Sequence, residues 1–237
     1  MKICYRLLAF LTASLILIKN AKGQLITDTS GKIAVRQFYE VIADNALLYN
    51  GTEYVNADPT IAGDPYFLGK WIINGNLVYN NVTYSDVPLL YDSWNDRVIS
   101  QRFNNGVLMT LISEKIKSFS LGNHIFIRVT KNATDDASPS TGFYEVIYGG
   151  NTQVIARHRK QIYESASLEK SFVESTHYFV RKDGKYFAIK NKKDLFGVLH
   201  DKSDGIKKLL KNNNLSYKKE PQETLVQAAT FYDQPGR

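Results

Sequence analysis

Turn-forming dipeptides separate short runs of β-forming residues over most of this chain, and they constrain its fold more than any other feature. Asn, Asp and Gly tolerate the positive φ angles that tight hairpin turns require. The runs at 125–129 and 143–148 alternate in the manner of half-buried strands. The clearest dipeptides are Asn-Gly at 50–51, 74–75 and 105–106 and Asp-Gly at 183–184, with Asn80-Asn81, Gly122-Asn123 and Gly149-Gly150 in similar places.

The recurrence of these signals predicts an antiparallel meander over residues 47–190. We therefore expect a mainly β fold, in which the meander forms a curled sheet, a sandwich or an open barrel. At least three of the four Asn-Gly and Asp-Gly sites should join two antiparallel neighbours. Residues 131–142 have the composition of a loop and should form a long exposed connection.

Helical patterns flank the predicted meander on both sides. Residues 24–46 place apolar side chains on one helical face and predict an N-terminal helical segment. Residues 191–237 predict a small C-terminal helical subdomain of three helices, packed on the sheet and closing it. Asn191 and Asp201 are expected to cap the first two helices, and Pro221 suits the first turn of the third. Their inward-facing residues should include Leu195, Val198, Leu199, Ile206, Leu209, Leu210, Leu225, Ala228, Ala229 and Tyr232.

Residues 1–23 have the pattern of a secretory signal peptide. Lys2 and Arg6 give a charged start, residues 7–18 form an apolar run, and small residues precede Gln24. The apolar run is shorter than the about 20 residues that a membrane-spanning helix needs. We expect cleavage near Gly23-Gln24 and a mature chain, without a transmembrane segment, that is periplasmic or secreted.

Cysteine content and charge narrow the class of protein. Cys4 is the one cysteine of the chain, so the mature chain has no thiol for a disulfide, a metal site or a nucleophile. Residues 24–156 hold nine Lys and Arg against 13 Asp and Glu, whereas residues 157–237 hold 17 against 10. The front of the mature chain is therefore acidic and the rear is basic, which indicates two regions with different surfaces.

Two long stretches resemble a group of exported proteins common in Bacteroidota. They are GDPYFLGKWIINGNLVYNNVTYSDVPLLYDSWNDRVI and YFVRKDGKYFAIKNKKDLFGVLHDKSDGIKKLLKNNNLSYKKEPQETLVQAATFYD, and SFSLGNHIFIRV and GFYEVIYGG continue the likeness. The group has no established activity, so the resemblance implies no catalytic residue at any position. It implies an exported protein with a β-rich body followed by Lys-rich C-terminal helices.

Established catalytic motifs are missing from the sequence, including HExxH, GxSxG and the Gly-rich phosphate loops. SLEK at 167–170 matches the Ser-x-x-Lys of penicillin-recognising enzymes, but their KTG and SDN motifs are missing, so the solvent face of a short helix is the simpler interpretation. The spacing of His124, His158, His177 and His200 predicts no metal site, and we expect no cofactor. His124 and His177 border β runs and suit half-buried structural roles.

Aromatic residues crowd the stretch from Tyr66 to Trp94. Aromatic faces on a sheet can stack on sugar rings, although strands also favour such residues for core packing. The candidate ligand-binding residues are Trp71, Tyr84, Tyr91 and Trp94. Asp86, Asp92 and Asp96 are close in sequence, and a glycosidase would need two such carboxylates about 5–10 Å apart.

Lysines are frequent in residues 181–219, and helical phasing places those of the helices opposite the apolar face. The expected exposed basic face consists of Lys192, Lys193, Lys207, Lys208 and Lys211. It is interpreted either as an ordinary solvated surface or as a surface that attracts lipid phosphates or acidic polysaccharide. Export argues against nucleic acid as a partner.

These observations favour an exported cell-envelope protein that acts as a binding or interaction module without catalysis. An envelope protein, a glycan and an anionic lipid surface are the candidate partners. The alternative is a hydrolase that acts on envelope or extracellular carbohydrate. A deep pocket with convergent carboxylates would favour the enzyme, whereas a shallow aromatic or basic surface would favour binding.

Overall fold

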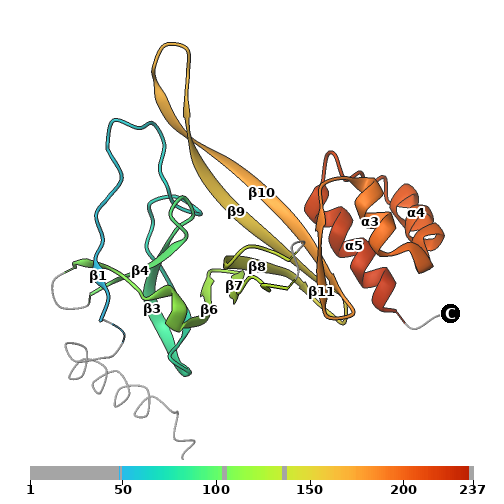
Figure 1. The fold of residues 1–237 in the computed structure, drawn as a ribbon, viewed down its shortest axis with the longest axis horizontal. Coiled ribbons are helices and arrows are strands. Elements are labelled where there is room, and N and C mark those ends of the chain that lie inside the picture. Colours follow the sequence, from blue (N-terminus) through green and yellow to red (C-terminus); the bar gives the residue numbers. More distant parts are fainter. Residues whose placement is uncertain (1–47, 49, 103–105, 135–137, 235–237) are drawn as a thin grey trace, which may run out of the picture. The chain divides into compact units, whose positions relative to one another are not determined.

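The computed structural model describes residues 48, 50–102, 106–134 and 138–234 (Figure 1). The chain divides into two compact units, residues 1–43 and residues 44–237, and every described residue belongs to the second unit. The predicted signal peptide at 1–23 and the predicted helical segment at 24–46 lie outside the described residues. Both therefore stay predictions.

Eleven antiparallel strands form a single sheet in the described part of the chain, so the expected mainly β fold is confirmed. The strand order is β1-β5-β4-β3-β2-β6-β7-β8-β9-β10-β11, which leaves β1 and β11 as edges of a sheet that does not close on itself. The strands are β1 (Thr52–Glu53), β2 (Ile73–Tyr79), β3 (Val82–Asp92), β4 (Arg97–Gln101), β5 (Leu108–Thr110), β6 (Ile116–Leu121), β7 (His124–Val129), β8 (Gly142–Gly149), β9 (Gln153–Glu164), β10 (Lys170–Lys182) and β11 (Lys185–Ile189).

Two meanders make up this sheet. Strands β2 to β5 follow one another as neighbours, as do β6 to β11, and the pairing of β2 with β6 joins the two sets. The 3₁₀ helix η3 (Ser113–Lys115) lies between β5 and β6 in the sequence. Asn80 and Asn81 form the turn between β2 and β3, and their φ angles of 54° and 64° are the positive values that a tight hairpin requires.

Two of the four Asn-Gly and Asp-Gly sites do not form turns, so the expectation that at least three would join antiparallel neighbours is wrong. Asp183-Gly184 joins β10 to β11, and Gly106 lies in the turn between β4 and β5. Gly75 instead lies inside β2, where a Cβ atom would collide with the carbonyl oxygen of Ser120 in β6.

Close approach of a neighbouring backbone also explains the glycine of the Asn50-Gly51 site. Gly51 directly precedes β1, and a Cβ atom there would collide with the carbonyl oxygen of Thr110 in β5. Strand β1 pairs with β5 and not with its neighbour in the sequence. Glycine at positions 51 and 75 therefore permits close approach of a neighbouring backbone, which is a second use of glycine in sheets.

Three α-helices follow the last strand in the described residues: α3 (Lys192–Val198), α4 (Ser203–Asn212) and α5 (Pro221–Asp233), with the 3₁₀ helix η4 (His200–Lys202) between the first two. The predicted cap at Asn191 is confirmed, because its side chain accepts hydrogen bonds from the backbone N–H groups of Lys193 and Asp194. Pro221 occupies the first turn of α5, as predicted.

Asp201 does not cap α4, which corrects the sequence prediction. The helix begins at Ser203, and no side chain caps its N-terminus. The Asp201 carboxylate instead accepts hydrogen bonds from Lys182 Nζ and from the Tyr232 hydroxyl, each at 2.7 Å. These bonds, that of Lys182 foremost, lower the pKa of Asp201 to about 2. Asp201 therefore links β10 to α5, a tertiary role that a capping pattern does not reveal.

The helices pack on the β8–β11 end of the sheet (Figure 1). The C-terminal residue of α5, Asp233, accepts hydrogen bonds from the Thr152 backbone N–H at 3.0 Å and from the Tyr148 hydroxyl at 3.1 Å. No described helix is long and apolar enough to cross a membrane. The buried residues shared by the helices and strands are Val154, Val180, Ile189, Leu195, Leu199, Ile206, Leu210, Leu225, Ala228 and Ala229.

A second core, rich in aromatic rings, lies among β2, β3, β6, β7 and β8. The rings of Phe119 and Phe126 are stacked with their centroids 4.8 Å apart, and Tyr91 and Phe143 pack edge-on against Phe119. Phe67 contacts Phe126 from outside the sheet strands, with centroids 5.2 Å apart. Many of the aromatic residues noted in the sequence are therefore packed in this core.

Candidate functional site

Among the described strands, none pairs with the outer part of the β9–β10 hairpin, where Ala62 forms an isolated bridge with Ser171. Strand β8 pairs with β9 only at 153–156, and β11 pairs with β10 only at 178–182. The two strands nevertheless continue to pair with each other as far as Glu164 and Lys170. Figure 1 shows them running on together past the end of β8. Residues 157–177 are called the ribbon below.

The ribbon exposes four large apolar side chains. Leu168 is 75% exposed at the turn and Tyr163 is 58% exposed. Val173 lies diagonally opposite Tyr163 on the same face of the two strands, whereas Ile162 lies on the other face, opposite Phe172. Leu168 also has a φ angle of +63°, a conformation that a side chain with a Cβ atom adopts at a cost of about 1–3 kcal/mol. The turn therefore presents a leucine side chain to solvent from a backbone conformation that leucine rarely adopts.

A segment that precedes β2 anchors the ribbon near its turn. Ala62 forms two backbone hydrogen bonds with β10, one to Lys170 and one from Phe172, each at 2.9 Å. Lys160 Nζ lies 3.0 Å from both the carbonyl oxygen and a carboxylate oxygen of Asp64. These contacts hold a two-stranded element that would be marginally stable alone in water.

The SLEK segment at 167–170 forms the ribbon turn and the start of β10, so the expectation of a short helix there is wrong. The Ser167 hydroxyl lies 2.9 Å from the Ser165 hydroxyl and 3.3 Å from a Glu169 carboxylate oxygen. Lys170 forms an ion pair with Glu164 at 3.6 Å. Ser167 and Lys170 therefore contact other residues of the hairpin and not each other.

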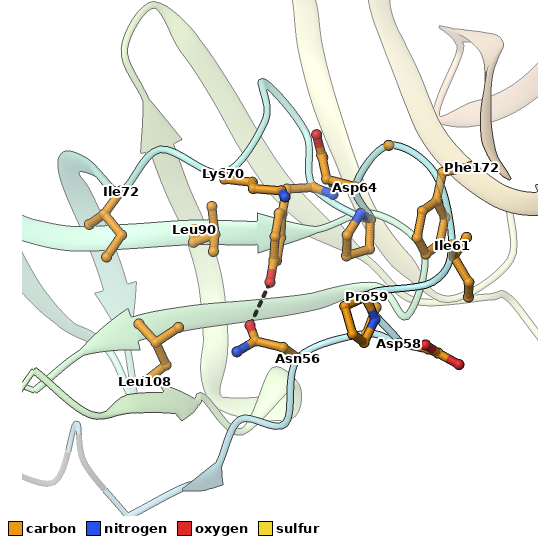
Figure 2. Close-up of a pocket in the computed structure, with 14 residues that line it drawn as sticks. Asn56, Asp58, Pro59, Ile61, Asp64, Lys70, Ile72, Leu90, Leu108 and Phe172 are labelled. Carbon is orange, nitrogen blue, oxygen red and sulfur yellow. Dashed lines mark hydrogen bonds between the residues drawn. The ribbon is translucent and has the colours of Figure 1, made fainter.

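An open cavity of about 380 Å³ lies where the preceding segment meets β10 at Phe172, near the outer end of the ribbon (Figure 2). Its floor includes Leu90 from β3 and Tyr66 and Ile61 from the segment, each less than 10% exposed. Phe172 lines it from β10 and Leu108 lines it from β5. The cavity thus collects apolar side chains from four separate parts of the chain.

Polar groups stand around this apolar floor. The Tyr66 hydroxyl donates to Asn56 Oδ1 at 3.0 Å, drawn as the dashed line in Figure 2, and burial raises the pKa of Tyr66. The Asp58 carboxylate accepts from the backbone N–H and the hydroxyl of Thr60, which lowers its pKa. Lys70 lines the cavity without a hydrogen bond or ion pair to any described residue.

A buried carboxylate joins two histidines elsewhere on the sheet. Glu145 Oε1 lies 2.6 Å from His124 Nδ1, and Glu145 Oε2 lies 2.6 Å from His158 Nε2. The three residues come from β8, β7 and β9. Phe67 covers them, with its ring centroid 5.1 Å from that of His124 and 4.6 Å from that of His158.

Glu145 is ionised in this cluster. Burial raises the pKa of its carboxyl group, but the hydrogen bonds from His158 and His124 outweigh burial, so the pKa lies below its ordinary value. An ionised carboxylate can only accept, so the imidazole nitrogens that face it carry hydrogens. The nitrogens that do not face Glu145 are His124 Nε2, on a side chain that is 37% exposed, and His158 Nδ1, which lies 3.3 Å from the Thr176 hydroxyl.

Sequence spacing could not have identified this cluster, since its residues are 13 and 21 positions from Glu145 on separate strands. The one available signal was Glu145 itself, a carboxylate inside the apolar run at 143–148. His124 is half-buried, as expected, and also binds Glu145. His177 is exposed on β10, so the expected half-buried position for it is wrong.

The four aromatic residues predicted to bind ligand have different surroundings. Tyr91 is fully buried, with its hydroxyl donating to Asp96 at 2.7 Å, and Tyr84 packs partly buried against the same core. The Trp94 ring contacts Phe172 with centroids 5.5 Å apart. Trp71 is 79% exposed. Of the four, Trp71 is the one whose ring is largely open to solvent.

The carboxylates considered for a glycosidase are engaged in local structure. Asp92 is fully buried and accepts from the Tyr54 hydroxyl at 3.0 Å and from two backbone N–H groups of its own turn. Asp96 accepts from Tyr91 and Arg157. Asp86 accepts from the Asn74 side chain at 3.0 Å. These bonds explain the three aspartates as structural residues.

The predicted basic face is exposed. Lys192 on α3 and Lys207 on α4 both place their amines over the Phe196 ring, 5.4 and 5.6 Å from its centroid. Lys207 also pairs with Asp204 at 2.8 Å. All five predicted lysines are exposed: Lys192, Lys193, Lys207, Lys208 and Lys211.

Among the described residues, no group of three or more His, Cys, Asp or Glu side chains is arranged to hold a metal ion. No protein-family model, no curated protein and no solved structure matches the chain. Functional inference therefore depends on the ribbon, the cavity, the His124–Glu145–His158 cluster and the basic face.

Proposed function

We propose that this chain is an exported cell-envelope protein that binds a protein partner through the ribbon, as a non-enzymatic interaction module. One observation carries the proposal: the ribbon exposes Tyr163 and Val173 on one face, Ile162 on the other face and Leu168 at its turn, beyond the strands that cover the rest of β9 and β10. Large exposed apolar side chains gathered on one projecting element mark an interaction site or an aggregation liability.

The charges of the ribbon favour a protein partner over the other two candidates. In the ribbon, Arg157, Arg159, Lys160 and Lys170 stand against Glu164, Glu169 and Glu174, and Arg157 is paired with Asp96 outside the ribbon. An element that is close to neutral has little net attraction to an anionic lipid surface. An element that exposes a tyrosine together with aliphatic side chains fits an apolar groove on a protein, where a buried aromatic side chain can supply much of the binding free energy.

Site-specific crosslinking tests the ribbon as the binding element. A photoreactive amino acid placed at Leu168 or Tyr163 should give a discrete adduct in cells, because these side chains would be buried in the partner. Val55 is 83% exposed outside the ribbon and serves as the control position. An adduct from the ribbon positions alone supports the proposal. No adduct, or equal adducts from Val55, contradicts it.

Export is the second part of the proposal. The charged start, the short apolar run and the small residues before Gln24 support it. N-terminal mass spectrometry of the protein in the envelope or secreted fraction should find Gln24 as the first residue. An intact Met1 in that fraction would contradict processing at this position.

The alternative, a hydrolase acting on envelope or extracellular carbohydrate, is favoured by the His124–Glu145 pair. A carboxylate that fixes one imidazole nitrogen as donor leaves the other as a general base, an arrangement used to cleave ester and amide bonds, whereas cleavage of a glycosidic bond uses two carboxylates. Release of ester-linked or amide-linked acyl groups from envelope polysaccharides would therefore measure this activity. Hydrolysis that His124→Asn abolishes and His177→Asn leaves unchanged would establish it over the non-enzymatic proposal.

A further inference from the structure

The cavity of Figure 2 has the composition of a small-molecule site. Its volume of about 380 Å³ lies within the range of about 300–1,000 Å³ that is typical of ligand pockets. Leu90, Ile61 and Phe172 give it an apolar floor, and Asn56 and Lys70 stand on its exposed rim. A ligand seated there would bury an apolar body and keep a polar end near the rim.

The two carboxylates of the lining already have partners. Asp64 Oδ1 accepts from Lys160 Nζ at 3.0 Å and from the Tyr66 backbone N–H at 2.9 Å. Asp58 Oδ1 accepts from both donors of Thr60. Figure 2 places the Asp58 carboxylate at the outer end of the lining, directed away from Leu90 and Leu108. Asp64 is therefore paired with a cation, whereas Asp58 keeps its charge but is directed away from the apolar floor.

The donors on the rim are unused. Within the described chain, the Lys70 amine has no hydrogen bond or ion pair. Lys70 is also the one Lys or Arg among the described residues that line the cavity. The Asn56 side chain uses its oxygen to accept from Tyr66, which leaves its amide hydrogens for another acceptor. Unpaired donors beside an apolar floor complement a ligand that has an apolar body and one anionic, hydrogen-bond-accepting group.

We propose that this cavity binds a carboxylate amphiphile, with its apolar body against Leu90, Ile61 and Phe172 and its carboxylate paired with Lys70. The apolar body supplies most of the affinity through burial. The Lys70 amine supplies the preference for a negative end. Its interaction with a charged ligand is weak because it is exposed, but it is attractive for an anion and repulsive for a cation. This site does not rest on the ribbon's protein partner, since the exposed residues at the ribbon turn do not line the cavity.

Three probes of equal chain length separate the apolar and the charged contributions. Isothermal titration calorimetry of the purified protein should use decanoate, decanol and decylammonium, each below its micelle-forming concentration and at low salt. Decanoate should bind about tenfold more tightly than decylammonium, with decanol between them. Lys70→Glu should reverse this order. Lys117→Glu, which changes an exposed lysine of β6 outside the cavity, should leave the order unchanged.

A second variant tests the apolar contacts. Leu108 lines the cavity and is partly exposed, so Leu108→Gln should weaken all three probes while the protein keeps its circular dichroism spectrum. Equal affinities for the three probes, an order that Lys70→Glu does not change, or no binding of any probe would each overturn the proposal. A failed result here leaves the crosslinking test of the ribbon unaffected, because that test uses other residues.

Discussion

Arg157 Nη2 donates a hydrogen bond to Asp96 Oδ2 over 3.0 Å, which ties β9 to the turn between β3 and β4. The two side chains are only 13% and 15% exposed. Asp96 Oδ1 accepts as well from the Tyr91 hydroxyl at 2.7 Å and from the Phe143 backbone N–H at 3.3 Å. A Cβ atom at Gly142 would collide with Asp96, so glycine is needed where β8 passes this pair.

Replacing Arg157 by Met should destabilise the protein by about 3 kcal/mol, because it leaves the largely buried Asp96 charge without its partner. Urea unfolding measures the change. Lys207→Met is the control, since it removes a pair with a 94% exposed aspartate and should cost less than about 1 kcal/mol. Equal losses of stability in the two variants would show that the Arg157–Asp96 pair contributes no more to stability than an exposed ion pair.

The pairing of the two charges can be separated from their individual effects. Asp96→Asn removes the charge that Arg157 faces, so the double variant Arg157→Met with Asp96→Asn should lose less stability than the two single losses combined. The difference measures the coupling between the side chains. Strict additivity would mean that each residue acts through its other contacts.

Glu145 should make the stability of the protein depend on pH. Its pKa is lowered in the folded state, since the bonds from His158 and His124 outweigh the effect of burial. A group with a depressed folded pKa stabilises the fold above its ordinary value, here 4.5, and this contribution is lost as the pH falls through the folded pKa. Glu145→Gln removes the charge and with it this dependence.

The measurement compares unfolding free energies of the two proteins at about pH 7 and about pH 3. The native protein should exceed Glu145→Gln in stability at the higher pH, and the gap should shrink at the lower pH. Glu114→Gln, which alters a 75% exposed carboxylate, should show little gap at either pH. A Glu145→Gln gap that stays constant with pH would contradict ionisation of this carboxylate as the stabilising feature.

Local sequence signals predicted those parts of the fold that depend on neighbouring residues. Asn191 and Pro221 mark helix starts through chemistry confined to one turn, and both predictions are confirmed. Asn74-Gly75 and Asn50-Gly51 have the same residue types as sites that do form hairpin turns. The need for glycine there comes from nearby carbonyl groups of β5 and β6, which are distant in sequence and cannot be found from a local pattern.

The candidate sites were less predictable for the same reason. The Glu145 cluster brings together three strands, and the cavity combines residues from Asn56 to Phe172. The density of aromatic residues near Tyr91 reflected core packing as well as surface. Helical phasing worked for Lys192 and Lys207, because a period of 3.6 residues separates the solvent face from the buried face within one element.

Gly75 and Gly197 should respond in opposite directions to alanine. Gly75→Ala places a methyl group against the Ser120 backbone, which cannot move without disturbing the pairing of β2 with β6, so a loss above about 1 kcal/mol is expected. Gly197 lies in α3 with open space around it, and Gly197→Ala should stabilise by about 0.5–1 kcal/mol. Thermal unfolding of both variants provides the measurement, and a neutral Gly75→Ala would contradict the close-approach explanation.

The basic face of the C-terminal helices should attract anionic surfaces at low salt. Residues 190–219 contain nine lysines, while the Asp194 carboxylate binds backbone N–H groups at the start of α3 and that of Asp201 binds Lys182. Each lysine near an anionic bilayer contributes about 1 kcal/mol, and exposed charges are screened over about 8 Å at physiological ionic strength. Binding to vesicles that contain anionic lipid should therefore weaken steeply as salt is raised.

The test compares two triple charge reversals of equal net charge. Lys207→Glu/Lys208→Glu/Lys211→Glu should abolish vesicle binding at low salt, because it reverses the exposed face of α4. Lys115→Glu/Lys117→Glu/Lys131→Glu changes lysines outside the C-terminal helices α3, α4 and α5 and should retain most of the binding. Equal losses would mean that net charge alone attracts the protein to the vesicle. If the native protein does not bind at low salt, the lysines form an ordinary solvated surface whose role is to keep the helices soluble.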